Sequence, residues 1–299
     1  WANVVPGNTK KTLWNSTYDI EELPQVIQPK SGYFYNANHS PFKSTDSIEN
    51  PQKNKFSENM GFEQYDNNRS IRLKKLIDQY PRFDYKDFKR IKFDKQFPNP
   101  FNYSWMDIDS LFLMRPSDYP RVKNILKSIQ SWDRVASANS YGAGSYAVLY
   151  SKLRKYYNRL PETKVFTTSV LKKALIETLQ HMEKYFGTTE IKLGSFQKLV
   201  RGEKELPIFG LPDVIASIGT APYKEGMRKA VSGESYIELV KFTPEGVEIE
   251  SINSYGSSDH MESKHFNDQL EKFATQKTKK MTFDKEEIYQ KAKAIYNPK

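Results

Sequence analysis

The sequence predicts an α+β fold in which helices enclose a few antiparallel strands. Two observations lead to this class. Apolar residues recur at helical spacing through the middle of the chain, most clearly over residues 168–186. Two runs rich in β-branched and aromatic residues, 235–242 and 247–252, then lie on either side of a turn. We find no internal repeat and no low-complexity tract.

Residues 1–68 are predicted to form an arm of loops and short strands, because they are rich in Pro, Asn, Ser and Gly and show no sustained period. Asn36 and Asn38 lie in this arm between turns at residues 31–32 and 40–41. An Asn in such a place usually bonds to nearby backbone or adopts a left-handed conformation. The alternative is that one of the two amides donates a hydrogen bond to a reacting group.

Residues 69–190 are predicted to be mainly helical. Helical spacing recurs over residues 71–80, 85–93, 122–132, 141–157 and 168–186. Pro81 closes the first of these helices, and Gly187 is the natural stop of the last. The small residues at 142–144 indicate a helix that packs closely at its first turn.

Residues 191–299 are predicted to contain strands followed by C-terminal helices. The two β-rich runs form a hairpin across residues 243–246. A final helix has Asp284 as its N-cap and Glu287 as the capping-box partner three residues later.

The composition indicates a folded chain that packs around aromatic rings. Of the 299 residues 37% are hydrophobic, but 19 are Tyr and 18 are Phe. The 46 Lys and Arg exceed the 36 Asp and Glu, giving a net charge of +10, yet the basic residues form small groups with acidic residues near most of them. No arginine-rich arm, zinc finger or RNP sequence is present, so we expect no nucleic-acid binding. No apolar run approaches the roughly 18 residues of a membrane span, and no signal peptide is evident.

Few side chains form a self-evident catalytic or metal site. The chain has no cysteine, which excludes disulfides, thiolate metal sites and a Cys nucleophile. Residues 259–265 include His260 and His265, but the spacing fits no standard zinc pair and a solvated loop is favoured. Residues 256–259 could hold a hydrolase serine, although a turn is favoured there because no His and acid can be placed around it.

Several stretches, in order along nearly the whole chain, resemble one enzyme family. They are residues 4–7 with 13–14, 22–25, 29–41, 69–77, 132–133 with Ser140, 194–210 ("GSFQKLVRGEKELPIFG"), 232–242 and 255–269. The family is the penicillin acylase (penicillin amidase) family of N-terminal-nucleophile hydrolases, and the sequence is most similar to its branch of acyl-homoserine-lactone and aculeacin-type acylases.

The resemblance implies that the chain is the C-terminal part of an acylase β chain, with a C-terminal portion of the αββα fold. Such enzymes cut their own precursor to expose a serine nucleophile at the start of the β chain. Trp1 cannot serve as that nucleophile, since an indole has no attacking oxygen or sulfur. The expected partners are therefore the rest of the precursor, namely the α chain and the N-terminal part of the β chain, and the 299 residues alone are predicted to be inactive.

The resemblance also implies two site residues. Asn38 matches the asparagine whose amide donates to the oxyanion of the tetrahedral intermediate. Arg69 matches an arginine that orients this asparagine and the nucleophile's amine, although the alternative is that Arg69 opens a solvated helix alongside Arg72. Asn36 keeps its structural interpretation.

The sequence departs from the family pattern at residues 28–29, His39, Phe196 and 233–235, which leaves the fold prediction intact and the substrate open. The resemblance implies an amide substrate of the N-acyl-homoserine lactone, lipopeptide or β-lactam type, and a periplasmic or secreted location. No cofactor is expected. The calcium common in the family cannot be assigned to residues here. The alternative function is a non-catalytic acylase-like fragment or binding module.

Overall fold

The computed structural model describes residues 4–157 and 167–295. The chain divides into two compact units, residues 1–70 and residues 71–299. Helix α1, Asn68–Ile77, begins in the first unit and continues into the second.

The first unit consists of loops and short 3-10 turns. The turns are η1 to η6, at Lys10–Thr12, Ile20–Glu22, Pro41–Lys43, Ser47–Glu49, Lys53–Lys55 and Glu58–Met60. The short strands expected in this arm are absent from residues 4–70. The physical reason is that a strand needs a ladder of backbone partners, and here the extended stretches share isolated bonds such as Tyr35 N–H to the Ser44 carbonyl, 2.8 Å.

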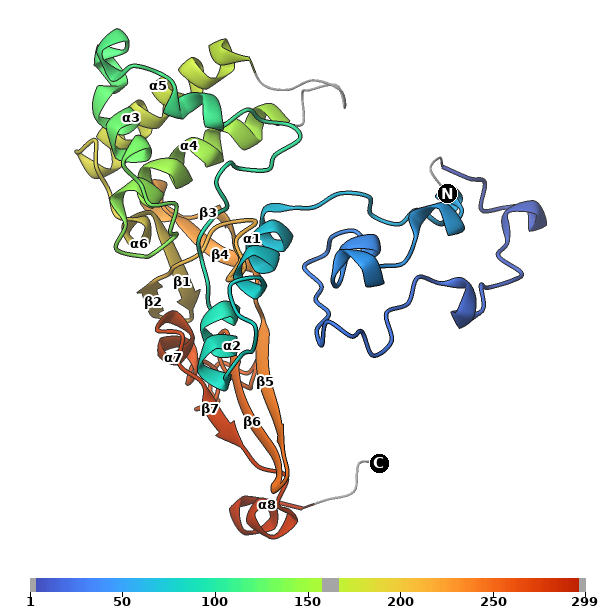
Figure 1. The fold of residues 1–299 in the computed structure, drawn as a ribbon. Helices are drawn as coiled ribbons and strands as arrows, with labels where there is room; N and C mark the ends of the chain where they lie inside the picture. Colours follow the sequence, from blue (N-terminus) through green and yellow to red (C-terminus); the bar gives the residue numbers. More distant parts are fainter. Residues whose placement is uncertain (1–3, 158–166, 296–299) are drawn as a thin grey trace. The chain divides into compact units, whose positions relative to one another are not determined.

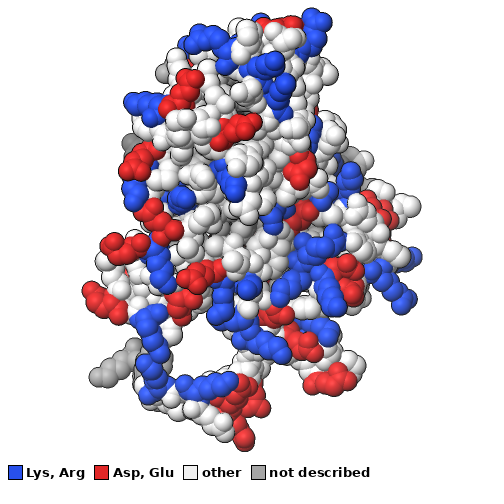
Figure 2. Space-filling view, turned by 90° about the vertical axis from the view of Figure 1, so that its left-hand side faces the viewer, with Lys and Arg blue, Asp and Glu red and all other residues white. Residues whose placement is uncertain are grey.

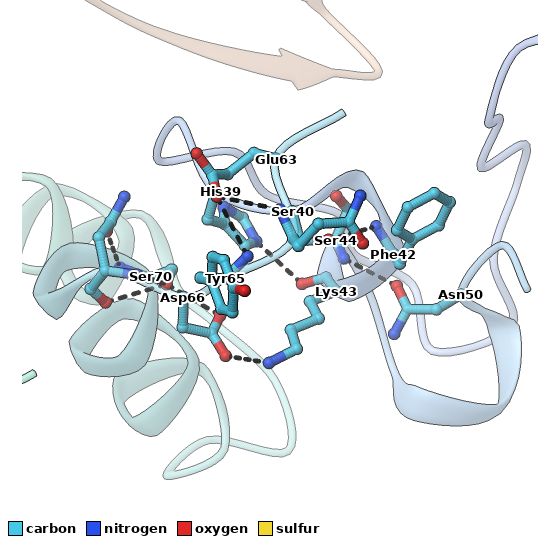
Figure 3. Close-up of polar contacts among 12 residues, drawn as sticks. His39, Ser40, Phe42, Lys43, Ser44, Asn50, Glu63, Tyr65, Asp66 and Ser70 are labelled. Carbon is cyan, nitrogen blue, oxygen red and sulfur yellow. Dashed lines mark hydrogen bonds and ion pairs between the residues drawn. The ribbon is translucent and has the colours of Figure 1, made fainter. Parts of the chain in front are cut away.

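Side chains take the place of a ladder in this unit. The Asn50 Oδ1 accepts hydrogen bonds from the backbone N–H groups of Ser44 and Thr45, at 2.7 and 3.0 Å (Figure 3). The rings of Phe42, Phe56 and Phe62 pack together, with centroids 5.6 to 6.4 Å apart. The unit is therefore ordered by turn chemistry and by a small aromatic cluster.

The second unit carries a helical core. Its helices are α2 Tyr85–Lys92, α3 Lys123–Gln130, α4 Tyr141–Tyr157, α5 Thr168–Phe186 and α6 Leu193–Phe196, and 3-10 turns η7 to η9 lie at Asp109–Phe112, Pro116–Asp118 and Pro120–Val122. The apolar faces of α3, α4 and α5 enclose one buried cluster that includes the ring of Tyr146. Figure 1 shows these three helices gathered at one end of the unit.

Two predicted helices have the expected bounds, α4 and α5. Gly187 follows α5 with a left-handed φ of 63°, as its role as the stop requires. The close packing expected at the start of α4 is confirmed, because a Cβ on Gly144 would lie 2.0 Å from the Ile191 carbonyl oxygen and one on Gly142 would lie 2.3 Å from Trp132 Cβ.

In the described part of the second unit, seven strands form two small sheets. The strands are β1 Gln197–Arg201, β2 Lys204–Pro207, β3 Ile218–Pro222, β4 Arg228–Gly233, β5 Tyr236–Thr243, β6 Gly246–Asn253 and β7 Lys279–Met281, with turn η10 at Lys224–Gly226. One sheet has the order β2-β1-β4-β3, with β1 and β4 parallel, and the other is antiparallel with the order β5-β6-β7. The predicted hairpin is confirmed as β5 and β6.

A second buried cluster fills the space between these sheets and helix α7, Leu270–Ala274. The Gln197 side chain is buried beside it and donates from Nε2 to the carbonyls of Ile208, Phe209 and Gly210, at 3.2, 3.2 and 2.7 Å. The last helix, α8 Lys285–Lys291, begins at Asp284, whose Oδ1 accepts from the Glu287 N–H at 2.8 Å. Half of the predicted capping box is thus present.

Two features of the structure can be compared with the expectations from composition, namely the distribution of surface charge and the length of the apolar helices. Figure 2 shows Lys and Arg side chains interspersed with Asp and Glu over the face that it presents. Among the described residues no helix is long and apolar enough to cross a membrane.

Candidate active site: the Asn38 loop

Asn38 lies on an exposed loop of the first unit in a left-handed conformation, with φ 54°. Asn tolerates this region better than most residues that have a Cβ. The backbone N–H of Asn38 donates to Oδ1 of Asn36 at 2.6 Å, which closes an Asx turn. Asn36 thus has the structural role that its turn context predicts, and it fixes the backbone from which the Asn38 side chain extends.

The His39 side chain stabilises the same turn through two hydrogen bonds to the backbone. Its Nε2 lies 2.9 Å from the Lys43 carbonyl oxygen and its Nδ1 lies 3.2 Å from the Ala37 N–H, so Nε2 carries the proton and Nδ1 accepts. The ring is buried and stacks on Tyr35 with centroids 4.8 Å apart. His39 departs from the family pattern in residue type, and here it has a framework role that sequence reasoning did not assign (Figure 3).

The start of helix α1 holds the loop from the other side. Asn67 donates from Nδ2 to the carbonyls of Ala37 and Asn38, at 2.8 and 3.1 Å. Its Oδ1 accepts from the Ser70 N–H at 2.9 Å, so the same side chain also caps the helix. Sequence reasoning missed Asn67; its position just before the first helical residue is the signal that could have found it.

Arg69 contacts the Asn38 side chain directly. Its Nη1 donates to Asn38 Oδ1 at 3.0 Å. A guanidinium has no acceptor, so the atom that faces it must be the amide oxygen, and Nδ2 must point the other way. Among the described residues no hydrogen bond uses Asn38 Nδ2 as its donor. The two residues named from the sequence are therefore brought together.

A polar network fixes the segment that bears Arg69. Ser70 Oγ donates to Asp66 Oδ1 at 3.0 Å, and Lys43 Nζ forms an ion pair with Asp66 Oδ2 at 2.5 Å (Figure 3). Ser40 N–H donates to the Tyr65 carbonyl at 3.2 Å. These bonds join residues 39–43 to residues 65–70 and hold Asn38 and Arg69 in register.

The arrangement can direct a neutral amide donor at developing negative charge, next to a fixed cation. A carbonyl oxygen that gains charge near Nδ2 would receive a hydrogen bond from a group that needs no reorganisation.

The other candidates from the sequence do not form sites. His265 Nδ1 lies 2.8 Å from Asp268 Oδ2, and within the described ranges no group of three or more His, Asp or Glu could hold a metal ion. Ser257 Oγ accepts from Gln269 Nε2 at 2.9 Å and Ser258 Oγ from the His260 N–H at 3.2 Å. Residues 256–259 form an irregular loop with a bend at Ser257 in place of the expected turn.

Comparison with known proteins places the chain in a family. The family model described as penicillin amidase matches residues 2–290. The chain belongs to the penicillin amidase family. The resemblance to the penicillin amidase family that the sequence motifs indicate is thereby confirmed.

Curated relatives match part of the chain. An acyl-homoserine lactone acylase PvdQ from Pseudomonas savastanoi pv. phaseolicola is 25% identical over 194 residues, which covers 57% of this chain and 24% of the relative. The PvdQ of Pseudomonas putida is 32% identical over 85 residues, or 27% of this chain and 11% of the relative. The chain therefore spans about a quarter or less of the length of these relatives.

A solved structure has a similar fold. The thermostable penicillin G acylase from Alcaligenes faecalis aligns with a TM-score of 0.51 and 14% sequence identity, covering 96% of this chain and 61% of that one. The α+β prediction is confirmed by this likeness and by the helices and sheets described above.

Proposed function

We propose that these residues form part of an acylase that hydrolyses the amide bond between an acyl group and an amine. The observation that supports this most is the hydrogen bond from Arg69 to Asn38 Oδ1, because it directs Nδ2 away from its supports. In this proposal Nδ2 donates to the oxyanion of the tetrahedral intermediate, and Arg69 is a positioning residue. The donor stabilises the transition state more than the ground state, because the charge on the oxygen develops only during attack.

The proposed nucleophile is the serine at the start of a self-processed β chain, outside these residues. Its own α-amine, with an ordinary pKa of about 7.7 to 8.0, takes the hydroxyl proton and later returns it to the leaving amine. No cofactor is proposed, since the serine, its amine and the oxyanion donor supply the catalytic groups, and water then releases the acyl group from the serine ester. Within the described residues no serine hydroxyl is hydrogen-bonded to a histidine ring, which supports the proposal that the 299 residues alone hydrolyse no amide.

The proposed partners are the α chain and the N-terminal part of the β chain. Strand β5 supports this, because among the described residues it pairs with β6 along one edge and has no neighbour along the other. An exposed edge of this length favours a further strand. The proposed substrate is an N-acyl-homoserine lactone, a lipopeptide or a β-lactam amide, and the proposed location is periplasmic or secreted.

The test is turnover by the complete, processed protein. We expect release of homoserine lactone from N-acyl-homoserine lactones, or of the amine from a chromogenic anilide or penicillin, and we expect none from a variant in which the upstream serine is replaced by alanine. Binding of these amides without turnover by processed protein would instead favour the non-catalytic binding module.

A further inference from the structure

A cavity of about 760 Å³ opens in the second unit between helices α4 and α5 and the segment from β3 to β4. Its wall is strongly basic. The cations that line it are Lys152, Lys155, Lys173, Lys184 and Arg228. Glu177 is the one carboxylate among the lining residues, so the described wall has a large excess of positive charge.

Lys152 is the buried member of this set, with 8% of its surface exposed. Its Nζ lies 2.9 Å from Nδ1 of His181, and Nε2 of His181 lies 2.8 Å from the Gly226 carbonyl oxygen. The carbonyl requires a proton on Nε2, so Nδ1 is the acceptor and the imidazole is neutral. Burial, and then the Lys152 cation, lower the pKa of His181, in agreement with this tautomer.

Within the described residues Lys152 has no carboxylate in ion-pair distance. Burial and the nearby cations Lys155 and Arg228 lower its pKa from 10.5 to about 8, while the Glu177 carboxylate acts in the opposite direction. A buried ammonium whose protein partner is neutral is costly, because the charge has left water without gaining a counterion.

Arg228 is in a similar position. Its Nε donates to Thr220 Oγ1 at 2.8 Å and its Nη2 donates to the Thr220 carbonyl, so both acceptors are neutral. Of the five N–H donors of a guanidinium, these bonds use two. Burial lowers the pKa of Arg228 as well.

The single carboxylate of the wall is already engaged. Glu177 Oε1 accepts from the Tyr156 hydroxyl at 2.5 Å. The described wall thus supplies five cations and one carboxylate, so its positive charge is only partly compensated.

We propose that this cavity binds a phosphate group, either free or as the monoester of a small organic molecule, through Lys152 and Arg228. A phosphate dianion offsets more of the excess charge than a carboxylate does, and its tetrahedral oxygens accept from donors that converge from several directions. Lys155, Lys173 and Lys184 add positive potential at the rim. The bound phosphate gives the Lys152 ammonium a counterion, while His181 stays in its neutral tautomer. This proposal does not depend on acylase activity.

The test is titration calorimetry of the complete protein at pH 7, with inorganic phosphate and with glycerol 1-phosphate as probes. We expect saturable binding of at least one probe, and the probe that binds more tightly identifies free phosphate or a monoester as the preferred form. Lys152→Met should weaken that binding by about 10-fold or more, because it removes a charge-assisted hydrogen bond. Arg228→Gln should weaken it comparably, and it keeps the proposal testable if Lys152→Met does not fold.

The matched control is Lys123→Met, which removes an exposed lysine of α3 that does not line the cavity. It should leave the affinity unchanged and so correct for the net charge of the protein. The proposal is overturned if neither probe binds saturably, or if folded Lys152→Met and Arg228→Gln bind both probes as tightly as Lys123→Met does.

Discussion

Nη1 of Arg69 donates a hydrogen bond to Oδ1 of Asn38 over 3.0 Å, and this single contact fixes which end of the Asn38 amide is presented outward. The backbone beneath it is fixed separately, by the Asx turn from Asn36 and by the two bonds from Asn67. The orientation and the position of the amide therefore depend on different residues, and substitutions can separate them.

Arg69→Leu in the complete protein should lower kcat by about 10-fold or more and should move the acidic limb of the pH-rate profile to higher pH. A nearby cation disfavours the protonated form of the nucleophile's amine, so its removal raises the pKa of that amine. Arg69→Lys should return the pH-rate profile most of the way to that of the wild type, because it keeps the positive charge. It should restore kcat less completely, because it changes the hydrogen-bond geometry.

Arg72→Leu is the matched control on the same helix. Arg72 binds Asp94 through Nε and Nη2, at 3.1 and 2.7 Å, so its loss should reduce stability. A profile that moves equally in Arg69→Leu and Arg72→Leu would argue against a positioning role for Arg69.

Asn36→Ala should cost about 0.5–2 kcal/mol of stability and leave kcat close to wild type, because it removes an acceptor from the Asn38 N–H without touching the amide. Asn36→Asp keeps an acceptor at the same place and should restore most of the loss. Thermal unfolding and steady-state kinetics on the same preparations check this. A kcat deficit in Asn36→Ala as large as in variants of Asn38 would show that the two residues act as one unit.

Gly144→Ala should destabilise the protein by about 2–3 kcal/mol, because the new Cβ would lie 2.0 Å from a backbone oxygen that cannot yield like a side-chain tip. Gly187→Ala is the comparison, since it meets nothing within 4 Å and has to pay only for its left-handed φ of 63°, about 1 kcal/mol. Urea unfolding at one pH ranks the two variants, and the reverse order would contradict the packing of α4 described here.

Lys152→Met should stabilise the protein in phosphate-free buffer by about 1–3 kcal/mol at pH 7, because it removes a buried charge that lacks a counterion. The gain should shrink as the pH rises. The pKa of Lys152 is about 8 in the folded state against 10.5 as the ordinary value, so between these pH values the unfolded state binds more protons and the wild type gains stability.

Urea unfolding of wild type and Lys152→Met at pH 7 and near pH 10 measures this difference. In the variant the pKa of His181 should also rise, since one of the causes that lower it is gone. A stability difference independent of pH would contradict a perturbed Lys152.

Helices were predictable where local signals and packing agree. Helix α5 has an unbroken apolar stripe and ends at a glycine. Helix α4 begins with small residues, which indicate close packing. The first and last residues of both helices could therefore be predicted from the sequence. The hairpin of β5 and β6 follows from two alternating runs around a short turn.

The sheet β2-β1-β4-β3 could not be predicted in the same way. Its strands are short, and the parallel pairing of β1 with β4 joins residues about thirty positions apart, which no local pattern reports. Gly202, with φ 61° between β1 and β2, and Gly226, with φ 73° between β3 and β4, mark turns but do not report which strands pair.

In the candidate site, too, some residues could be named from the sequence and others only from the structure. Asn38 and Arg69 were named through family resemblance, while the support from Asn67 and His39 depends on contacts across about 30 residues and on a ring tautomer. Neither is visible in composition or spacing. Whether Asn38 acts on the oxyanion stays a prediction.

The most direct test of the account is kcat of Asn38→Asp in the complete, processed protein. Aspartate keeps the size, the tolerance of left-handed φ and an oxygen for Arg69, and the adjacent guanidinium keeps it ionised, so the change replaces the Nδ2 donor with an acceptor. Rates are normalised to processed protein, because maturation would need the same donor, and Asn36→Asp is the control. We predict a fall in kcat of roughly 100-fold or more with little change in KM. A processed Asn38→Asp enzyme with wild-type kcat would contradict the assignment of Asn38 to the oxyanion.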